Sequence, residues 1–251
     1  MDDILTQLPP PSRFFIEDLN NFASPSPPLP SPFVVLQNAR RNPDLLVVAI
    51  SAPSVFLFHH ATTKSLVGTL VLPETSFAAN PITPSLRENS CNIYALDGTP
   101  STLVAVVQYR VPADRSHVLA RCLISEIRPQ KVLILDSIQR QNFRGRLSVD
   151  DTVVYKLETS EQRMSTGCPM VRNLEYFPSG SVIDGLGAAL LARCQIEKMK
   201  GTLCVSWPDI NSSAISLLKL LLKDVLPSTK FDASAESFHV RDARTDSELY
   251  A

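Results

Sequence analysis

Short runs of apolar, often β-branched residues recur along the chain from Phe33 onward. They span residues 45–50, 55–58, 66–72, 92–96, 103–109, 131–135 and 203–206. Several of these runs are apolar throughout instead of alternating with polar residues, which is typical of strands buried on both faces. We therefore predict a largely buried sheet that has these seven runs as its strands.

Three further segments have the spacing of amphipathic helices. The first starts at a candidate cap, Asp114, and runs to about residue 127, with its apolar side chains on one side. The second is predicted to start at Ser181 or Asp184. The third is capped by Asn211 and stopped by Pro227.

From residue 103 the predicted order is strand, helix, strand, long loop, helix, strand, helix. This order is typical of an α/β protein whose sheet carries helices on its faces. Two connections, residues 73–90 and about 160–180, are unusually long for a compact domain. The predicted fold class is therefore α/β, a sheet flanked by helices.

Proline divides the chain. Eight of the 20 prolines lie in the first 32 residues, where neither helix interiors nor central strands can form around them. Residues from about 228 to 248 lack a periodic pattern. We predict a Pro-rich flexible arm at 1–32, an α/β domain at 33–227 and a mobile tail at 228–251.

Composition and charge narrow the class of protein. The chain has 251 residues, and its net charge of −1 gives no basic footprint for nucleic acid or an anionic membrane. No apolar run approaches the roughly 18–20 residues of a membrane span. The start, Met1-Asp2-Asp3, lacks a basic region followed by an apolar one, so secretion is not expected. We expect the cytoplasm, with or without the nucleus.

The cysteines point to a reducing compartment. Their number is odd, they are widely spaced and they form no C-x-x-C pair, which argues against a zinc site and a disulfide framework. We expect reduced thiols, no metal and no cofactor. The five are Cys91, Cys122, Cys168, Cys194 and Cys204.

Motifs of catalytic chemistry are missing from the sequence. There is no G-x-S-x-G elbow and no P-loop, and Gly185-Leu186-Gly187 is only a fragment of a dinucleotide fingerprint. On a strand, His59 and His60 would point in opposite directions and could not easily share a metal. Asp136-Ser137 follows a predicted strand, where α/β ligand sites usually lie. The basic, amide-rich segment 139–146 after it is either a solvated loop or a surface for an anion or a partner.

The chain ends with Leu249-Tyr250-Ala251, a hydrophobic–Tyr–any sequence that closes a polar run. Such an end offers an aliphatic side chain, a phenol and a free carboxylate, and capture of a terminal carboxylate is an established mode of peptide recognition. We predict that these three residues form a partner-binding site.

Body and tail together resemble the eukaryotic proteasome assembly chaperone 1 family, as a divergent or plant-like member. Three stretches carry the resemblance: residues 45–60, the helix-then-strand unit at 174–209, and the ending Leu249-Tyr250-Ala251. The Pro-rich arm matches nothing in that family, and the loops 73–90 and 160–180 match it poorly.

The resemblance implies a role without catalysis. Members pair with proteasome assembly chaperone 2, bind the α-subunit ring of the core proteasome and promote its assembly. Their tails insert into pockets between α subunits, a role that here falls to Leu249, Tyr250 and Ala251. The implied fold is a nucleoside-phosphorylase-like α/β sandwich without an active site. The alternative from the same fold class is a cryptic α/β hydrolase or nucleoside-phosphorylase-like enzyme, which would need a polar pocket with convergent titratable groups.

Overall fold

The computed structural model describes residues 30–36, 42–73, 91–96, 101–148, 150–165, 170–209 and 211–231. The chain divides into two units, Met1–Pro30 and Ser31–Ala251, and all the described helices and strands belong to the second. Most of the predicted Pro-rich arm, nearly all of the loop 73–90 and residues 232–251, with the ending Leu249-Tyr250-Ala251, lie outside the described residues.

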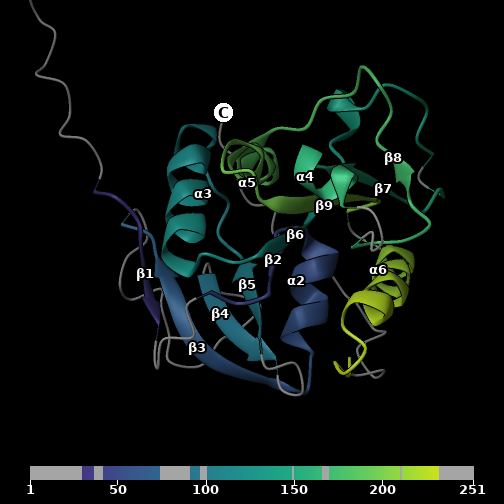
Figure 1. The fold of residues 1–251 in the computed structure, drawn as a ribbon. Coiled ribbons are helices and arrows are strands. Elements are labelled where there is room, and N and C mark those ends of the chain that lie inside the picture. Colours follow the sequence, from purple (N-terminus) through teal and green to yellow (C-terminus); the bar gives the residue numbers. More distant parts are fainter. Residues whose placement is uncertain are drawn as a thin grey trace, which may run out of the picture. The chain divides into compact units, whose positions relative to one another are not determined.

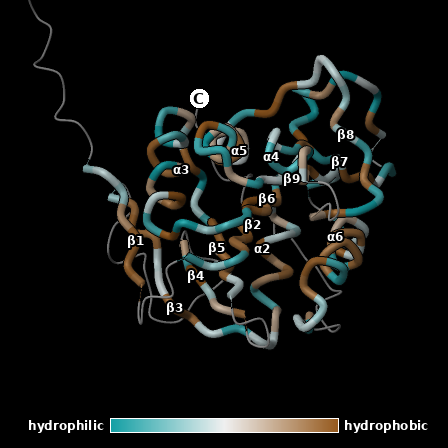
Figure 2. The backbone as a smooth tube through the Cα atoms, viewed as in Figure 1, coloured by the Kyte–Doolittle hydropathy of each residue, from teal (hydrophilic) through white to brown (hydrophobic). Residues whose placement is uncertain are grey.

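A single nine-stranded sheet runs through the described part of the second unit (Figure 1), in the order β1-β3-β4-β5-β2-β6-β9-β7-β8. The central strands are apolar over most of their length, which Figure 2 shows as brown tube. The strands are β1 (Phe33–Leu36), β2 (Leu45–Ala49), β3 (Lys64–Val71), β4 (Cys91–Leu96), β5 (Thr102–Val107), β6 (Lys131–Ser137), β7 (Val153–Glu158), β8 (Glu175–Tyr176) and β9 (Lys200–Trp207).

The centre of the sheet is parallel. β2 pairs with β5 on one side and β6 on the other, so that Val47 lies between Val104 and Leu133, and β6 pairs with β9. The flanking strands β4, β3 and β1 are antiparallel, β7 is antiparallel to β9, and β8 is parallel to β7. Both faces of the parallel strands are covered, which explains why their sequences do not alternate.

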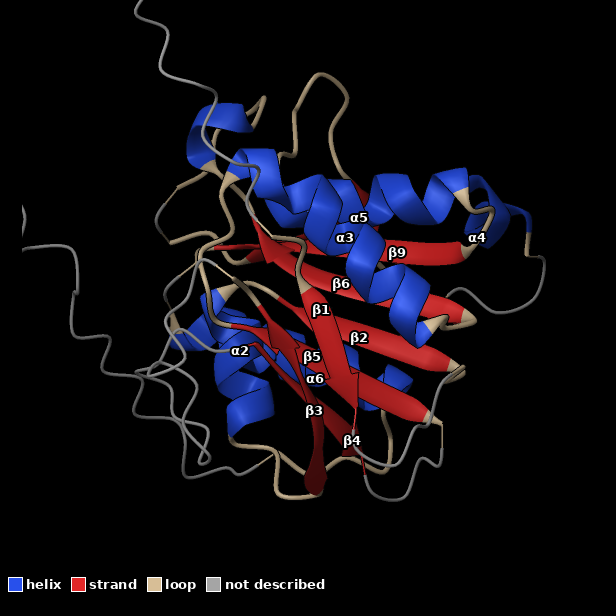
Figure 3. Ribbon diagram, turned by 90° about the vertical axis from the view of Figure 1, so that its left-hand side faces the viewer, coloured by secondary structure: helices blue, strands red, loops and turns tan. Residues whose placement is uncertain are grey.

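Helices cover both faces, giving three layers (Figure 3). On one face, α3 (Ala113–Ile127) and α5 (Gly185–Ile196) pack Leu123 and Leu190 against the sheet. On the other, α2 (Ala52–His59) and α6 (Ser212–Val225) contribute Phe58 and Leu222. Each such fully buried side chain contributes about 1.5–3 kcal/mol. The predicted fold class, α/β with helices flanking a sheet, is confirmed.

Six of the seven predicted strands are confirmed, as β2, β3, β4, β5, β6 and β9. The predicted helices are α3, α5 and α6. Asp184 holds the cap position of α5, and Asn211 caps α6 with its side chain, which accepts a hydrogen bond from the Ser213 N–H at 3.2 Å. The cap predicted at Asp114 is wrong, because Pro112 holds that position and Asp114 lies in the first turn.

The strand predicted at 55–58 is also wrong, because these residues belong to α2. Pro53, Ser54, Phe56, Leu57 and Phe58 are all buried, and a helix that is apolar all round shows no periodicity to distinguish it from a buried strand. The prediction that His59 and His60 lie on a strand and point in opposite directions is therefore wrong. At the end of α2 their ring centroids are 5.2 Å apart.

Among the described residues, four strands or α-helices lie where the sequence predicted none. β1 lies at the end of the Pro-rich segment, and β7 precedes the long connection at 160–180, which contains α4 (Ser160–Met164) and β8. Of the predicted tail, residues 228–231 are described. Phe231 forms a β-bridge with Ala61, and its ring centroid lies 5.8 Å from that of Phe58.

Candidate functional site

A cavity of about 750 Å³ opens at the edge of the sheet where the parallel strands end. Because β5, β2, β6 and β9 run in the same direction, the segments that follow them converge at this edge. These segments and the start of α5 supply the walls. Open α/β sheets bind ligands at this position, so the cavity is the candidate functional site of the described residues.

Asp136, near the carboxyl end of β6, is a partly buried carboxyl residue in the wall of this cavity. Its Oδ1 accepts a hydrogen bond from the Ser137 N–H at 2.8 Å, and its carboxyl group also accepts one from the Gly187 N–H in the first turn of α5. A Cβ at position 187 would lie 2.3 Å from Asp136 Oδ2. Gly187 therefore leaves the space that the carboxyl group fills, a role that the glycine pattern alone did not indicate.

The environment raises the pKa of Asp136 to about 6. Burial is the largest cause, because it penalises the charged form, and the nearby carboxylates of Asp209 and Asp184 act in the same direction. The hydrogen bonds from Ser137 and Gly187 oppose this shift without cancelling it. Asp136 therefore changes charge just below neutral pH.

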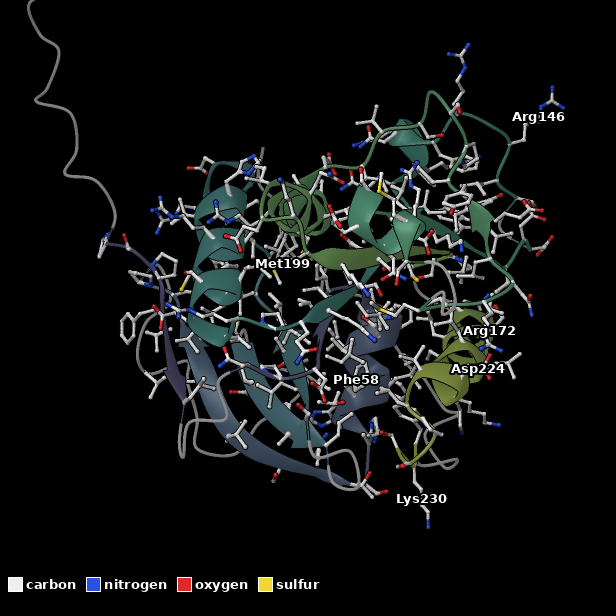
Figure 4. All side chains as sticks on the ribbon, in the orientation of Figure 1. Phe58, Arg146, Arg172, Met199, Asp224 and Lys230 are labelled. Carbon is white, nitrogen blue, oxygen red and sulfur yellow. The ribbon has the colours of Figure 1, made fainter. Side chains whose placement is uncertain are left out.

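Asp184 connects the segment after β6 to the start of α5 through hydrogen bonds. Its carboxylate accepts hydrogen bonds from Gln139 Nε2 at 2.8 Å and Asn142 Nδ2 at 3.1 Å. The Val182 N–H donates to the Asn142 carbonyl at 2.8 Å, and the Arg144 N–H to Ser181 Oγ at 2.8 Å. Side chains of this segment are largely exposed, and Arg146 projects away from the ribbon (Figure 4).

Asp209 brings a third carboxyl group to the cavity, from the segment after β9. Its Oδ1 is buried, and no hydrogen-bond partner for it is found in the part of the chain that the structure describes. Arg110, after β5, and Arg140, after β6, also line the cavity from exposed positions. Among the described residues, no group of three His, Cys, Asp or Glu side chains is arranged to hold a metal ion.

A second polar cluster, absent from the sequence predictions, lies on β7 and β8. Lys156 Nζ is 3.3 Å from Glu158 Oε1, and both side chains are buried. The Tyr176 hydroxyl donates to Glu158 Oε2 at 2.6 Å, and Lys156 lies over the Tyr176 ring, 5.0 Å from its centroid. An ion pair with this many partners fixes β8 on β7. Because Lys156 and Glu158 are charged, the sequence of β7 did not resemble that of a buried strand.

The cysteine thiols within the described residues are Cys91, Cys122, Cys194 and Cys204, all free. Burial raises the pKa of Cys91, Cys194 and Cys204 to about 12 and that of Cys122 to about 11. Such thiols are poor nucleophiles because the thiolate is the reactive form. Cys168 lies outside the described residues, as do the predicted partner-binding residues Leu249, Tyr250 and Ala251. No helix among the described residues has the length and apolar character to cross a membrane.

No protein-family model matches this chain, and no curated protein matches it. Solved structures do. PbaB of Pyrococcus furiosus, an archaeal proteasome activator, aligns with a TM-score of 0.58 and 11% identity over 82% of this chain and 93% of that one. PbaA of the same organism, an archaeal homologue of proteasome-assembly chaperone, aligns with a TM-score of 0.54 and 15% identity over 78% and 86%. A Thermoplasma acidophilum protein of unknown function aligns with a TM-score of 0.53 and 13% identity over 77% and 79%. At these identities the likeness is one of fold.

Proposed function

We propose that this protein is a proteasome assembly chaperone. The observation that carries the proposal is the similarity of fold to PbaA and PbaB, which extends over most of this chain and most of each of theirs. PbaA is described as an archaeal homologue of proteasome-assembly chaperone. PbaB is described as an archaeal proteasome activator. The hydrophobic–Tyr–any ending Leu249-Tyr250-Ala251 supports it independently, because fold comparison does not depend on those three residues.

In this proposal the protein acts as a heterodimer with proteasome assembly chaperone 2, in the cytoplasm with or without the nucleus. The pair binds the α-subunit ring of the core proteasome and promotes correct assembly of the ring. Leu249 and Tyr250 insert between α subunits, and the Ala251 carboxylate pairs with a cation there, a charge-assisted contact. No catalytic step is needed for this role.

Exposed apolar side chains support a partner surface on the body. Phe33 and Val35 of the edge strand β1 are 50% and 46% exposed, and Leu66 of the neighbouring β3 is 44% exposed. Large apolar side chains gathered in this way are typical of protein–protein contacts. Heterodimer formation would remove them from water.

Affinity purification of the tagged full-length chain from eukaryotic cells, followed by mass spectrometry, tests the proposal. We expect a chaperone 2-like protein and proteasome α subunits among the stoichiometric partners. The same purification with a chain that lacks residues 249–251 should still recover the chaperone 2-like protein but should recover much less of the α subunits. Recovery of neither from the full-length chain would reject the proposal.

The second candidate is an enzyme of the hydrolase or nucleoside-phosphorylase type. The specific observation in its favour is the cavity at the carboxyl edge, where Asp136, with its raised pKa, is placed as a general acid or base. Assaying the purified heterodimer for turnover of esters, and of nucleosides in the presence of phosphate, would distinguish the enzyme from the chaperone. Turnover that Asp136→Asn abolishes would favour the enzyme.

A further inference from the structure

The two outer strands of the described sheet differ in how well they are protected. β1 ends the sheet on one side and β8 ends it on the other (Figure 1). Proteins usually guard such edges with charged side chains, proline, bulges or very short strands, because an outer strand presents backbone N–H and C=O groups that can pair with another chain. β8 is guarded, since it has two residues and one of them is Glu175. β1 reads Phe-Val-Val-Leu, without a charge or a proline.

The side chains of β1 alternate between two environments. Val34 and Leu36 are partly buried against the core that includes α3. Phe33 and Val35 lie on the other face of the strand and are 50% and 46% exposed. Among the described residues β1 pairs only with β3, so an open backbone edge and two exposed apolar side chains occur on the same short strand. Another strand would satisfy the edge and cover the side chains together.

The geometry of β1 makes a second copy of the same strand a fitting occupant. Residues opposite each other in an antiparallel pair lie on the same face of the sheet. A two-fold symmetric pair that keeps this rule is centred on a residue. If it is centred on Val34, each Phe33 lies opposite Val35 of the other copy, and both exposed side chains are covered. A pair centred on Val35 would set Phe33 opposite residue 37, which is a glutamine.

We propose that the outer edge of β1 pairs with β1 of a second copy of this chain, antiparallel and centred on Val34. Two nine-stranded sheets then join into one. The same surface serves both copies, as in most symmetric dimers, and an aromatic side chain opposite a β-branched one is a favourable cross-strand pair. A four-residue strand buries less than the usual interface of about 1,200–2,000 Å², so the dimer is weak and reversible.

The proposed heterodimer would cover the same exposed side chains of β1. A chaperone 2-like partner should therefore compete with the second copy, and the self-paired form is the state of the chain before it meets that partner. Self-association of the purified chain requires neither that partner nor the α ring. Its measurement is therefore independent of the chaperone role, and either proposal can fail while the other stands.

Sedimentation velocity of the full-length chain over a range of concentrations tests the pairing. We expect a reversible dimer with a Kd on the order of 100 µM. Val35→Lys sets an ammonium group opposite Phe33 of the second copy and should raise the Kd at least about 10-fold. Leu220→Lys is the matched control, because Leu220 is an apolar residue of α6 that is 63% exposed and lies far from β1 (Figure 1). It should dimerise as the unmodified chain does.

Cysteine cross-linking tests the register without adding a charge. In a pair centred on residue 34 the two Cα atoms lie about 4.5–5.5 Å apart, inside the range of about 4.4–6.8 Å that a disulfide spans. Val34→Cys should therefore give a covalent dimer on mild oxidation. Val35→Cys should give much less, because residue 33 of the other copy lies opposite it. The unmodified chain, with its five native cysteines, supplies the background.

Three outcomes would overturn the proposal. The first is a chain that stays monomeric at every concentration up to about 1 mM, the scale of the weakest specific affinities. The second is a dimer that Val35→Lys leaves unchanged. The third is cross-linking of Val35→Cys that equals or exceeds that of Val34→Cys.

Discussion

Gly187 in α5 lies so close to Asp136 at the end of β6 that a Cβ at position 187 would be 2.3 Å from Asp136 Oδ2. No Cβ tolerates that distance, and the carboxyl group is held by the Ser137 N–H and the Gly187 N–H. The first turn of α5 and the end of β6 are therefore fitted to each other. Two segments distant in sequence set the shape of the cavity at the carboxyl edge.

Gly187→Ala should lower the free energy of unfolding by about 1–3 kcal/mol, the usual range for overpacking a filled interior. The physical reason is displacement of the partly buried, hydrogen-bonded carboxyl group of Asp136. Urea denaturation measures it. In the double variant Gly187→Ala/Asp136→Ala the clash is absent, so the loss should be smaller than the sum of the single losses. Additive losses would show that the two groups do not compete for space.

The raised pKa of Asp136 makes stability depend on pH. The folded carboxyl group has a pKa of about 6 against a reference value of 3.8, so between these values the folded state binds more protons than the unfolded one. Stability from this group is therefore fully present at low pH and is lost as pH rises toward the folded pKa, by at most about 3 kcal/mol.

The measurement is the free energy of unfolding at several pH values for the unmodified chain and for Asp136→Asn. The variant should lack the fall between about pH 4 and about pH 6 that this carboxyl group causes. Its stability relative to the unmodified chain should therefore improve as pH rises. Parallel pH profiles for the two proteins would contradict the assignment.

The buried pair of Lys156 and Glu158 gives a third prediction. Lys156→Met leaves Glu158 buried without its cation and should destabilise the fold by about 3 kcal/mol. Glu158 would keep only the Tyr176 hydroxyl among its side-chain partners described here. Lys156→Met/Glu158→Leu should recover much of the loss, because no buried charge remains. Thermal or urea denaturation of the single and double variants checks this, and a double variant weaker than Lys156→Met would refute it.

Much of the fold follows from local patterns. The uninterrupted apolar runs predicted the parallel strands. Asn211 and Pro227 predicted the two ends of α6, because caps and helix-stopping residues act within one turn of the helix end. α2 could not be predicted, since Phe56, Leu57 and Phe58 are all buried and erase the helical period. β7 was missed because Lys156 and Glu158 are buried only by virtue of pairing with each other and with Tyr176.

The candidate site was predictable in part. Asp136 stood out because it follows a predicted strand, at the edge where α/β sheets bind ligands. Its meeting with Gly187 and Asp209 was not predictable, since the order of strands in the sheet brings them together and no local pattern encodes that order. Gly185-Leu186-Gly187 looked like a fragment of a dinucleotide fingerprint, whereas in the structure the missing side chain of Gly187 leaves space for the carboxyl group of Asp136.

The most direct test of the chaperone proposal is the affinity of the heterodimer for isolated proteasome α rings, with and without residues 249–251. The same preparation of chaperone 2-like partner is used in both. We predict that truncation, or Tyr250→Ala, weakens binding by about 1–3 kcal/mol, the scale of one anchor residue, while heterodimer formation is unchanged. One residue added after Ala251 should have a similar effect, since it moves the carboxylate by about 3.5 Å. Equal affinities for the full-length, truncated and extended chains would contradict the anchoring role of Leu249, Tyr250 and Ala251, and no binding of α rings by any of them would contradict the chaperone function itself.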